Sequence, residues 1–349
     1  MQDVFIVILK SLVALFVPLL TLPLILQVER RGAAYIQKRV GPNRVGPFGI
    51  LQPLADVLKF LFKEEVTPSH VQPFFYNAAP IISLIVAVLP LAAIPFCAPF
   101  ELNGAIFFPE AFHSPLGVFY IFAVAELGFY GILLAGWASN NKFSMLGALR
   151  ATAQMVSYEL SLSVTIVCIL LVYGTVDIHE IIAYQEQSLL FFIPRYGFLL
   201  QPIAMLIFLV GIFAECNRLP FDLAEGESEL VAGYHVEYSS MKFAMFFLSE
   251  YMHMIVLSAL FVILFFGGYS LLPGLSLITA SSPALLPYLQ FLSLIAKVAF
   301  MIWFFIWVRW SIPRFRYDQL MHLGWKILFP LSILNLLITV IVTYLWGNA

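Results

Sequence analysis

The sequence is poor in charge: only 11% of its 349 residues are charged, while 62% are hydrophobic. A soluble domain carries roughly 25% charged residues, so the composition excludes an ordinary soluble protein. Several apolar runs of about 18 residues or more are long enough to cross a bilayer core roughly 30 Å thick. The sequence therefore predicts an all-α polytopic membrane protein, built as a single integral membrane domain over residues 1–349.

Cysteine and nucleotide-binding motifs are also scarce. The three cysteines, Cys97, Cys168 and Cys216, lie far apart and form no Cys-x-x-Cys pair. This spacing argues against an iron–sulfur cluster, a c-type haem or a disulfide framework, and no GxGxxG loop is present. We expect no metal site, no covalently bound cofactor and no complete active site in this chain alone.

Eight apolar segments are predicted to cross the membrane, together with a short amphipathic helix, and the fifth segment is short. They cover approximately residues 4–27, 75–98, 117–138, 152–173, 198–214, 241–266, 289–308 and 327–346. The start of the chain, MQDVFIVILK, has an acidic residue where a signal peptide would be basic, and its apolar run is too long for such a peptide. We therefore expect the first helix to remain in the mature protein.

Lysine and arginine predict the orientation, because these residues gather in cytoplasmic loops. Most of the 18 basic residues fall in the first, third, fifth and seventh loops, and the loops between them contain only Arg195. The odd-numbered loops are therefore predicted to be cytoplasmic, with both termini outside.

The first cytoplasmic loop covers residues 29–74. In it, the turn-rich stretch GPNRVGPFG is followed by the amphipathic stretch LQPLADVLKFLFK. Helical spacing places four side chains on one polar face: Gln52, Asp56, Lys59 and Lys63. This helix either lies on the membrane surface or lines a cavity for a molecule with a polar head and an apolar tail, such as a quinone. We expect Asp56 to pair with Lys59, and Glu29 with Arg30, to hold charge in a partly dry site.

Carboxylates are also predicted within the membrane, where each costs at least ~2.5–3.5 kcal/mol. They lie in four different spans: Glu126, Glu159, Glu215 and Glu250. One such residue is easily a structural hydrogen-bond anchor, but four favour a proton pathway, because neighbouring buried carboxylates titrate as a coupled group. His253 and Lys297 also fall within spans, and we expect only a supporting role for them.

The fifth loop, residues 215–240, contains PFDLAEGESELVAGYHVEY, which has five carboxylates and no lysine or arginine. It is interpreted as the cytoplasmic mouth of the acidic series or as a docking surface for a basic partner, and the two interpretations are compatible.

Long stretches of the chain resemble a known family. ERRGAAYIQKRVGPNRVGPFGILQPLADVLKFLFKE, GWASNNKFSMLGALRATAQMVSYEL and AECNRLPFDLAEGESELVAGYHVEY are similar to signatures of the H subunit (also called subunit 1) of NADH:quinone oxidoreductase, respiratory complex I. FIWVRWSIPRFRYDQLMHLGWK is similar to the family's seventh loop, and the resemblance covers nearly all of the chain from Gln27 onward.

The resemblance implies an eight-helix subunit that forms much of the chamber through which quinone enters. The matching chamber positions are Glu29, Arg30, Arg39, Asp56 and Lys59. The matching proton-coupling positions are Glu126, Glu159, Glu215, Asp222, Glu225, Glu227 and Glu250. It also implies a bacterial cell inner membrane, ubiquinone or menaquinone as substrate, and partner subunits that carry NADH, FMN and iron–sulfur clusters. Small membrane-arm subunits and membrane lipid are further expected partners, and nucleic acid is not.

Two other classes of protein compete with this hypothesis. The homologous subunit of a membrane-bound hydrogenase is one, although AEGESELVAGYHVEY and GPNRVGPFGILQPLAD favour the NADH–quinone branch. A stand-alone ion transporter is the other: intramembrane carboxylates suit it, but the lack of a visible inverted repeat and the elaborate first loop argue against it.

Overall fold

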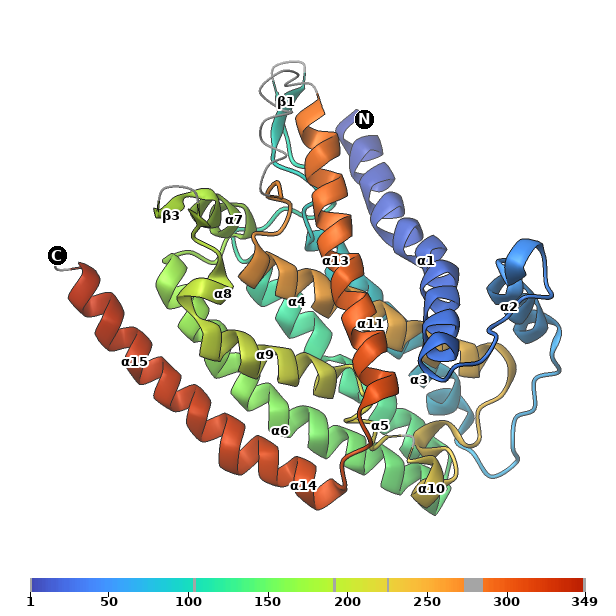
Figure 1. Ribbon diagram of the computed structural model, residues 1–349. Coiled ribbons are helices and arrows are strands. Elements are labelled where there is room, and N and C mark those ends of the chain that lie inside the picture. Colours follow the sequence, from blue (N-terminus) through green and yellow to red (C-terminus); the bar gives the residue numbers. More distant parts are fainter. Residues whose placement is uncertain (1, 103–104, 191–192, 225, 273–284, 348–349) are drawn as a thin grey trace.

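The computed structural model describes residues 2–102, 105–190, 193–224, 226–272 and 285–347 (Figure 1). Within these ranges, seven helices are long and apolar enough to cross a membrane, so the prediction of an all-α polytopic membrane protein is confirmed. The spanning elements are α1 (Gln2–Ile36), α3 (Pro73–Val88) with the 3-10 turn η2 (Leu89–Ala93), α4 (Gly117–Glu126) with α5 (Gly128–Ala138), α6 (Lys142–Tyr173), α11 (Ser240–Phe266), α13 (Leu286–Ser311), and α14 (Tyr317–His322) with the π-helical η5 (Leu323–Leu328) and α15 (Phe329–Gly347).

The predicted fifth span is the shortest, as its sequence indicated. The single turn α8 (Gly197–Leu200) precedes α9 (Pro202–Glu215), which has 14 residues. At 1.5 Å per residue such a helix is roughly 21 Å long, whereas a bilayer core needs about 20 residues. The eight predicted segments therefore correspond to seven full-length spans and one short apolar helix.

Two predicted boundaries were wrong because hydropathy detects only the apolar part of a helix. α1 continues to Ile36, well past the predicted end at residue 27. α6 begins at Lys142 rather than at residue 152. The Asn141 side chain caps α6 by accepting a hydrogen bond from the backbone N–H of Phe143 at 2.9 Å, so the helix starts in a polar segment.

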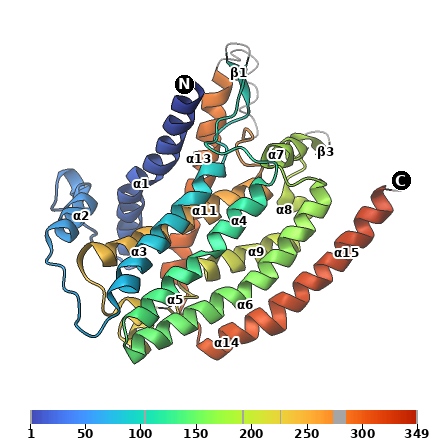
Figure 2. The ribbon, with the colours of Figure 1, turned by 180° about the vertical axis from the view of Figure 1, so that it is seen from behind.

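α11 lies at the centre of the bundle, as both ribbon views show (Figures 1 and 2). Of its most apolar window, 78% is buried inside the molecule, against 22% for the corresponding window of α1. A helix that is apolar all round is typically enclosed by other helices, and α11 contacts α1, α3, α9 and α13. Polar side chains on α11 therefore point into the protein.

Short two-stranded antiparallel sheets and short helices connect the spans. β1 (Phe100–Leu102) pairs antiparallel with β2 (Ala105–Phe107), β3 (Ser188–Leu190) pairs with β4 (Ile193–Pro194), and α7 (Ile178–Glu186) lies towards the same upper end of Figure 1. Further connecting elements among the described residues are η1 (Pro47–Gly49), α2 (Gln52–Phe62), α10 (Glu227–Leu230) and η3 (Gly233–His235). The predicted amphipathic helix is confirmed as α2. The Ser240 hydroxyl anchors it to the start of α11, at 2.9 Å from the carbonyl oxygens of both Phe60 and Lys63.

Candidate functional site

The first contact of the site joins α2 to α1. Arg30 and Asp56 form an ion pair at 2.5 Å, with side chains that are 42% and 26% exposed. The expected pairing of Asp56 with Lys59 and of Glu29 with Arg30 was wrong. Consecutive helical residues do not face each other, so Arg30 turns to α2 while Glu29 turns into the bundle. Lys59 is exposed, and the exposed Arg39 donates to the Gln37 side chain at 2.7 Å.

Glu29 is buried, and its charge is compensated by side chains from two other helices. The Tyr251 hydroxyl on α11 donates to Glu29 Oε2 at 2.6 Å. Arg309 on α13 forms an ion pair with Glu29 Oε1. The Arg218 guanidinium lies over the Tyr251 ring, 4.2 Å from its centroid. Such compensation is what allows a carboxylate to remain charged in a dry site.

Arg218 also connects Glu29 to the second acid, Glu250 on α11. The guanidinium of Arg218 is 3.7 Å from Glu250 Oε2, and it lies within electrostatic reach of Glu29. The Tyr234 hydroxyl donates to Glu250 Oε1 at 3.1 Å. Arg218 therefore interacts with both carboxylates, the buried Glu29 and the partly buried Glu250.

A small cavity with several polar side chains in its wall lies beside Glu250. Its volume is about 30 Å³, and its wall includes Tyr234, Glu250, His253 and Glu215. This is room for roughly two water molecules, since one needs about 10–15 Å³. His253 Nε2 is 3.8 Å from Glu215 Oε1, which exceeds a hydrogen bond, and both side chains line the cavity, where water could contact each of them. Among the described residues, neither carboxylate oxygen of Glu215 has a hydrogen-bond partner.

The two remaining membrane carboxylates lie within electrostatic reach of Glu215. Glu126, the last residue of α4, is buried and interacts with both Glu215 and Glu159. Glu159 on α6 is half-buried and interacts with Glu215. The structure therefore brings Glu126, Glu159 and Glu250 around the end of α9, from three different helices.

The acidic loop is held to the protein by basic and amide side chains. Asp222 is buried and pairs with Arg314 at 3.0 Å. Glu229 on α10 pairs with Arg150 at 2.5 Å, and the Asn141 amide donates to Glu237 at 2.6 Å. Glu225 lies outside the described residues, and Glu227 begins α10 with a side chain that is not described.

Lys297, predicted to have only a supporting role, caps a helix. Its ammonium donates to the carbonyl oxygens of Phe266 at 2.9 Å, Gly268 at 3.0 Å and Ser270 at 2.8 Å. A cation at the C-terminus of a helix satisfies carbonyls that lack a helical partner and complements the helix dipole. Lys297 thus stabilises the end of α11, away from the acidic cavity.

Several residues of this network were missed by the sequence reasoning. Arg218, Tyr234, Tyr251 and Arg309 lie within or beside stretches that carried the family resemblance. The clustering of intramembrane acids required nearby cations and hydroxyls to balance their charge, but no spacing rule identifies which ones. The pairing is long-range: Arg309 and Glu29 are 280 positions apart in the chain.

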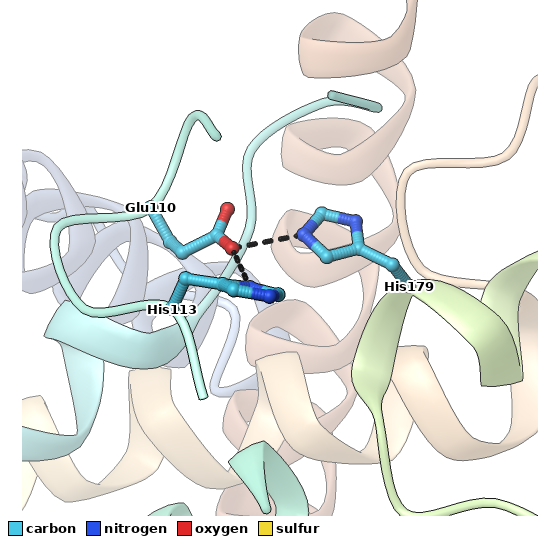
Figure 3. Close-up of side chains that lie close together, drawn as sticks. All are labelled: Glu110, His113 and His179. Atoms are coloured by element: carbon cyan, nitrogen blue, oxygen red, sulfur yellow. Dashed lines mark hydrogen bonds and ion pairs between the residues drawn. The ribbon is translucent and has the colours of Figure 1, made fainter. Parts of the chain in front are cut away.

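A second cluster, also missed, lies in the connecting segments at the other end of the molecule. It consists of Glu110 in the segment after β2, His113 three residues later, and His179 on α7 (Figure 3). Burial by itself raises the pKa of Glu110, but the hydrogen bond and charge of His179, with further hydrogen bonds that include His113, lower it below its ordinary value. The Glu-x-x-His spacing in PEAFHSP was the available sequence signal.

The fold and the site define a polytopic membrane protein with a series of buried and partly buried carboxylates contributed by several helices. A sequence model of the family described as NADH dehydrogenase matches residues 9–340. Relatives named as the H subunit of NADH-quinone oxidoreductase include that of Bdellovibrio bacteriovorus, 43% identical over 97% of this chain and 96% of the relative. That of Salinibacter ruber is 46% identical over 94% and 93%, and that of Flavobacterium psychrophilum is 47% identical over 89% of each. The chain belongs to the NADH dehydrogenase family, as the H subunit of complex I does, which confirms the resemblance.

Proposed function

We propose that this chain is the membrane subunit of a proton-translocating NADH:quinone oxidoreductase that forms much of the quinone-access chamber. It couples quinone reduction to proton translocation through its membrane carboxylates. The names of the relatives support the oxidoreductase. The observation that carries the coupling role is the series of contacts from the Arg30–Asp56 pair, through Glu29 and Arg218, to Glu250 and the cavity beside Glu215.

The chamber is proposed to lie where α2 meets α1. The ion pair between Arg30 and Asp56 offers charge to a polar headgroup. Leu58 and Phe62 on α2 are exposed and apolar, which suits the tail of a quinone or the surrounding lipid. Glu29, Arg39 and Lys59 complete the proposed set of chamber residues.

Coupling is proposed to be electrostatic. Reduction of a quinone takes up two electrons and two protons, and the quinol formed is neutral. If the two protons come from side chains at the chamber, those side chains become more negative, so the charge at the chamber changes. Each contact in the series transmits part of that change, because unit charges about 4 Å apart interact by roughly 4 kcal/mol at an effective dielectric constant near 20. The Arg218–Glu250 separation of 3.7 Å is in this range. Glu215, Glu126 and Glu159 would then exchange protons through bridging water.

The electrons are proposed to arrive from partner subunits. This sequence has no GxGxxG loop and no cysteine ligand set, so NADH, FMN and iron–sulfur clusters are assigned to peripheral subunits. Asp222, Glu225 and Glu227 are proposed to link the chamber to the membrane carboxylates. The complex is placed in a bacterial inner membrane with the odd-numbered loops on the cytoplasmic side, as the positive charges predict.

The test is a Glu215→Gln substitution in the assembled complex. This change keeps the shape of the side chain but removes its proton exchange. We expect NADH-driven quinone reduction to fall at least tenfold, while NADH oxidation by a soluble acceptor such as ferricyanide stays within twofold. Glu180→Gln is the matched control, because Glu180 is an exposed acid on α7. Equal loss of both activities would instead show failed assembly, and unchanged quinone reduction would refute the role of Glu215.

A further inference from the structure

The cluster of Glu110, His113 and His179 lies outside the network described above. Glu110 Oε1 is 2.7 Å from His113 Nδ1 and 2.9 Å from His179 Nε2. Figure 3 shows the carboxylate directed towards both imidazole rings, which come from two separate segments of the chain. Only 2% of the Glu110 side chain is exposed, against 33% for His113.

The donor set suits a divalent transition metal. Two imidazole nitrogens and one carboxylate oxygen are a known three-residue ligand set for zinc, with a fourth position left open. The three ligand atoms lie within 4.8 Å of one another. Zinc bonds of about 2.0–2.1 Å in a tetrahedron require ligand atoms roughly 3.3 Å apart. The two separations between Glu110 and the histidine nitrogens, 2.7 and 2.9 Å, would therefore lengthen by about 0.5 Å around a bound ion.

The surroundings of the cluster support a ligand role. His179 Nδ1 is 3.0 Å from the Tyr269 hydroxyl, which orients the ring so that Nε2 faces Glu110, as in many metal sites. Glu110 Oε2 is buried and, in the part of the chain described, has no hydrogen-bond partner. The exposed part of His113 leaves a path for an ion.

One neighbouring cation has to be weighed against this site. Lys10 lies within electrostatic reach of Glu110. Its ammonium donates to the Phe108 carbonyl and stands 3.9 Å from the centroid of the Phe107 ring. The ammonium is therefore engaged by a carbonyl and an aromatic ring, which leaves the Glu110 carboxylate directed towards the two histidines.

We propose that Glu110, His113 and His179 form a zinc-binding site, with Tyr269 as the residue that orients His179. The ion would join the segment between β2 and α4 to α7 and, through Tyr269, to the segment after α11. The site is separate from the carboxylate series, and its test does not depend on the oxidoreductase activity.

The experiment measures zinc on the chain purified from detergent-extracted membranes with the subunits that accompany it. The preparation is stripped with EDTA, titrated with zinc sulfate against a chromogenic chelator and, after desalting, analysed for bound zinc by mass spectrometry. Three variants are compared with the unaltered chain: His113→Gln, Tyr269→Phe and the control His70→Gln. His70 is an exposed histidine with a carboxylate neighbour, Glu237. It therefore has the same side chain and the same kind of neighbour as His113 but lies outside the proposed site.

We expect the unaltered chain and His70→Gln to hold one more zinc ion per chain than His113→Gln. Tyr269→Phe should keep the ion but bind it about tenfold more weakly, since loss of such an orienting partner costs about 10–100-fold in affinity. The zinc X-ray absorption spectrum should show nitrogen and oxygen neighbours and no sulfur. Equal zinc content and affinity in all four proteins, or binding that needs millimolar zinc in the unaltered chain, would overturn the proposal and leave a hydrogen-bonded cluster.

Discussion

Tyr251 offers the sharpest test of the proposed link between a quinone chamber and the membrane carboxylates. Its hydroxyl donates to Glu29 Oε2 at 2.6 Å, and Arg309 holds the other oxygen. Tyr251→Phe removes this one donor and keeps the ring over which Arg218 lies. The change therefore separates the hydrogen bond from the packing.

The expected magnitude follows from the burial of Glu29, which is only 6% exposed. A hydrogen bond to a charged group contributes about 1.5–3 kcal/mol, and water cannot readily replace a donor at a buried site. If this hydrogen bond stabilises the transition state of the coupled step, a loss of about 1.4 kcal/mol lowers the rate tenfold. We expect NADH-driven quinone reduction to fall about tenfold and ferricyanide reduction to stay within twofold.

Tyr173→Phe is the matched control. Tyr173 is also buried, and its hydroxyl donates to the Leu264 carbonyl at 2.6 Å, but it lies outside the carboxylate series. Equal rates in the two variants would refute the reasoning. A second check combines Tyr251→Phe with Glu29→Gln: the two effects must be strongly non-additive, because they act on one contact.

Two further substitutions test other parts of the site. Asp56→Asn should weaken quinone turnover at low quinone concentration. The protein should still fold, because a partly exposed ion pair contributes at most about 1 kcal/mol to stability. Unchanged kinetics would contradict the chamber assignment. Gly147→Ala places a Cβ 2.8 Å from the Gly233 backbone and 2.9 Å from Tyr234 N, whereas Gly128→Ala meets nothing closer than 3.5 Å. Overpacking costs about 1–3 kcal/mol, so thermal unfolding of the complex should show a lower midpoint for Gly147→Ala only.

Local sequence properties decided the class of the protein and the position of most helices. The scarcity of charge and the long apolar runs left helices as the main structure able to span a bilayer, because backbone groups must be satisfied within each segment. The short fifth segment became α9 with 14 residues, and the amphipathic pattern of LQPLADVLKFLFK became α2. The ends of α1 and α6 were missed because polar residues extend a helix without adding to its hydropathy.

The intramembrane acids could be identified from the sequence, because a carboxylate within an apolar span is costly and therefore rare. The residues that contact them could not be identified in this way. Glu29 was expected to pair with the adjacent Arg30, and it pairs instead with Arg309 and Tyr251 from other helices. From the sequence, Lys297 could be described only as a charged residue within a span. The structure shows that it donates to three carbonyl oxygens at the end of α11. Local spacing cannot supply such contacts.

The sequence by itself therefore determined that this chain is a helical membrane protein of the NADH dehydrogenase family with acids inside its spans. Only the tertiary structure decided that Glu126, Glu159, Glu215 and Glu250 converge from four helices and that Arg218 interacts with both Glu29 and Glu250. The physical reason is that hydropathy and helical periodicity act over a few turns of one segment. The electrostatic partners of a buried charge are set by how whole helices pack around α11.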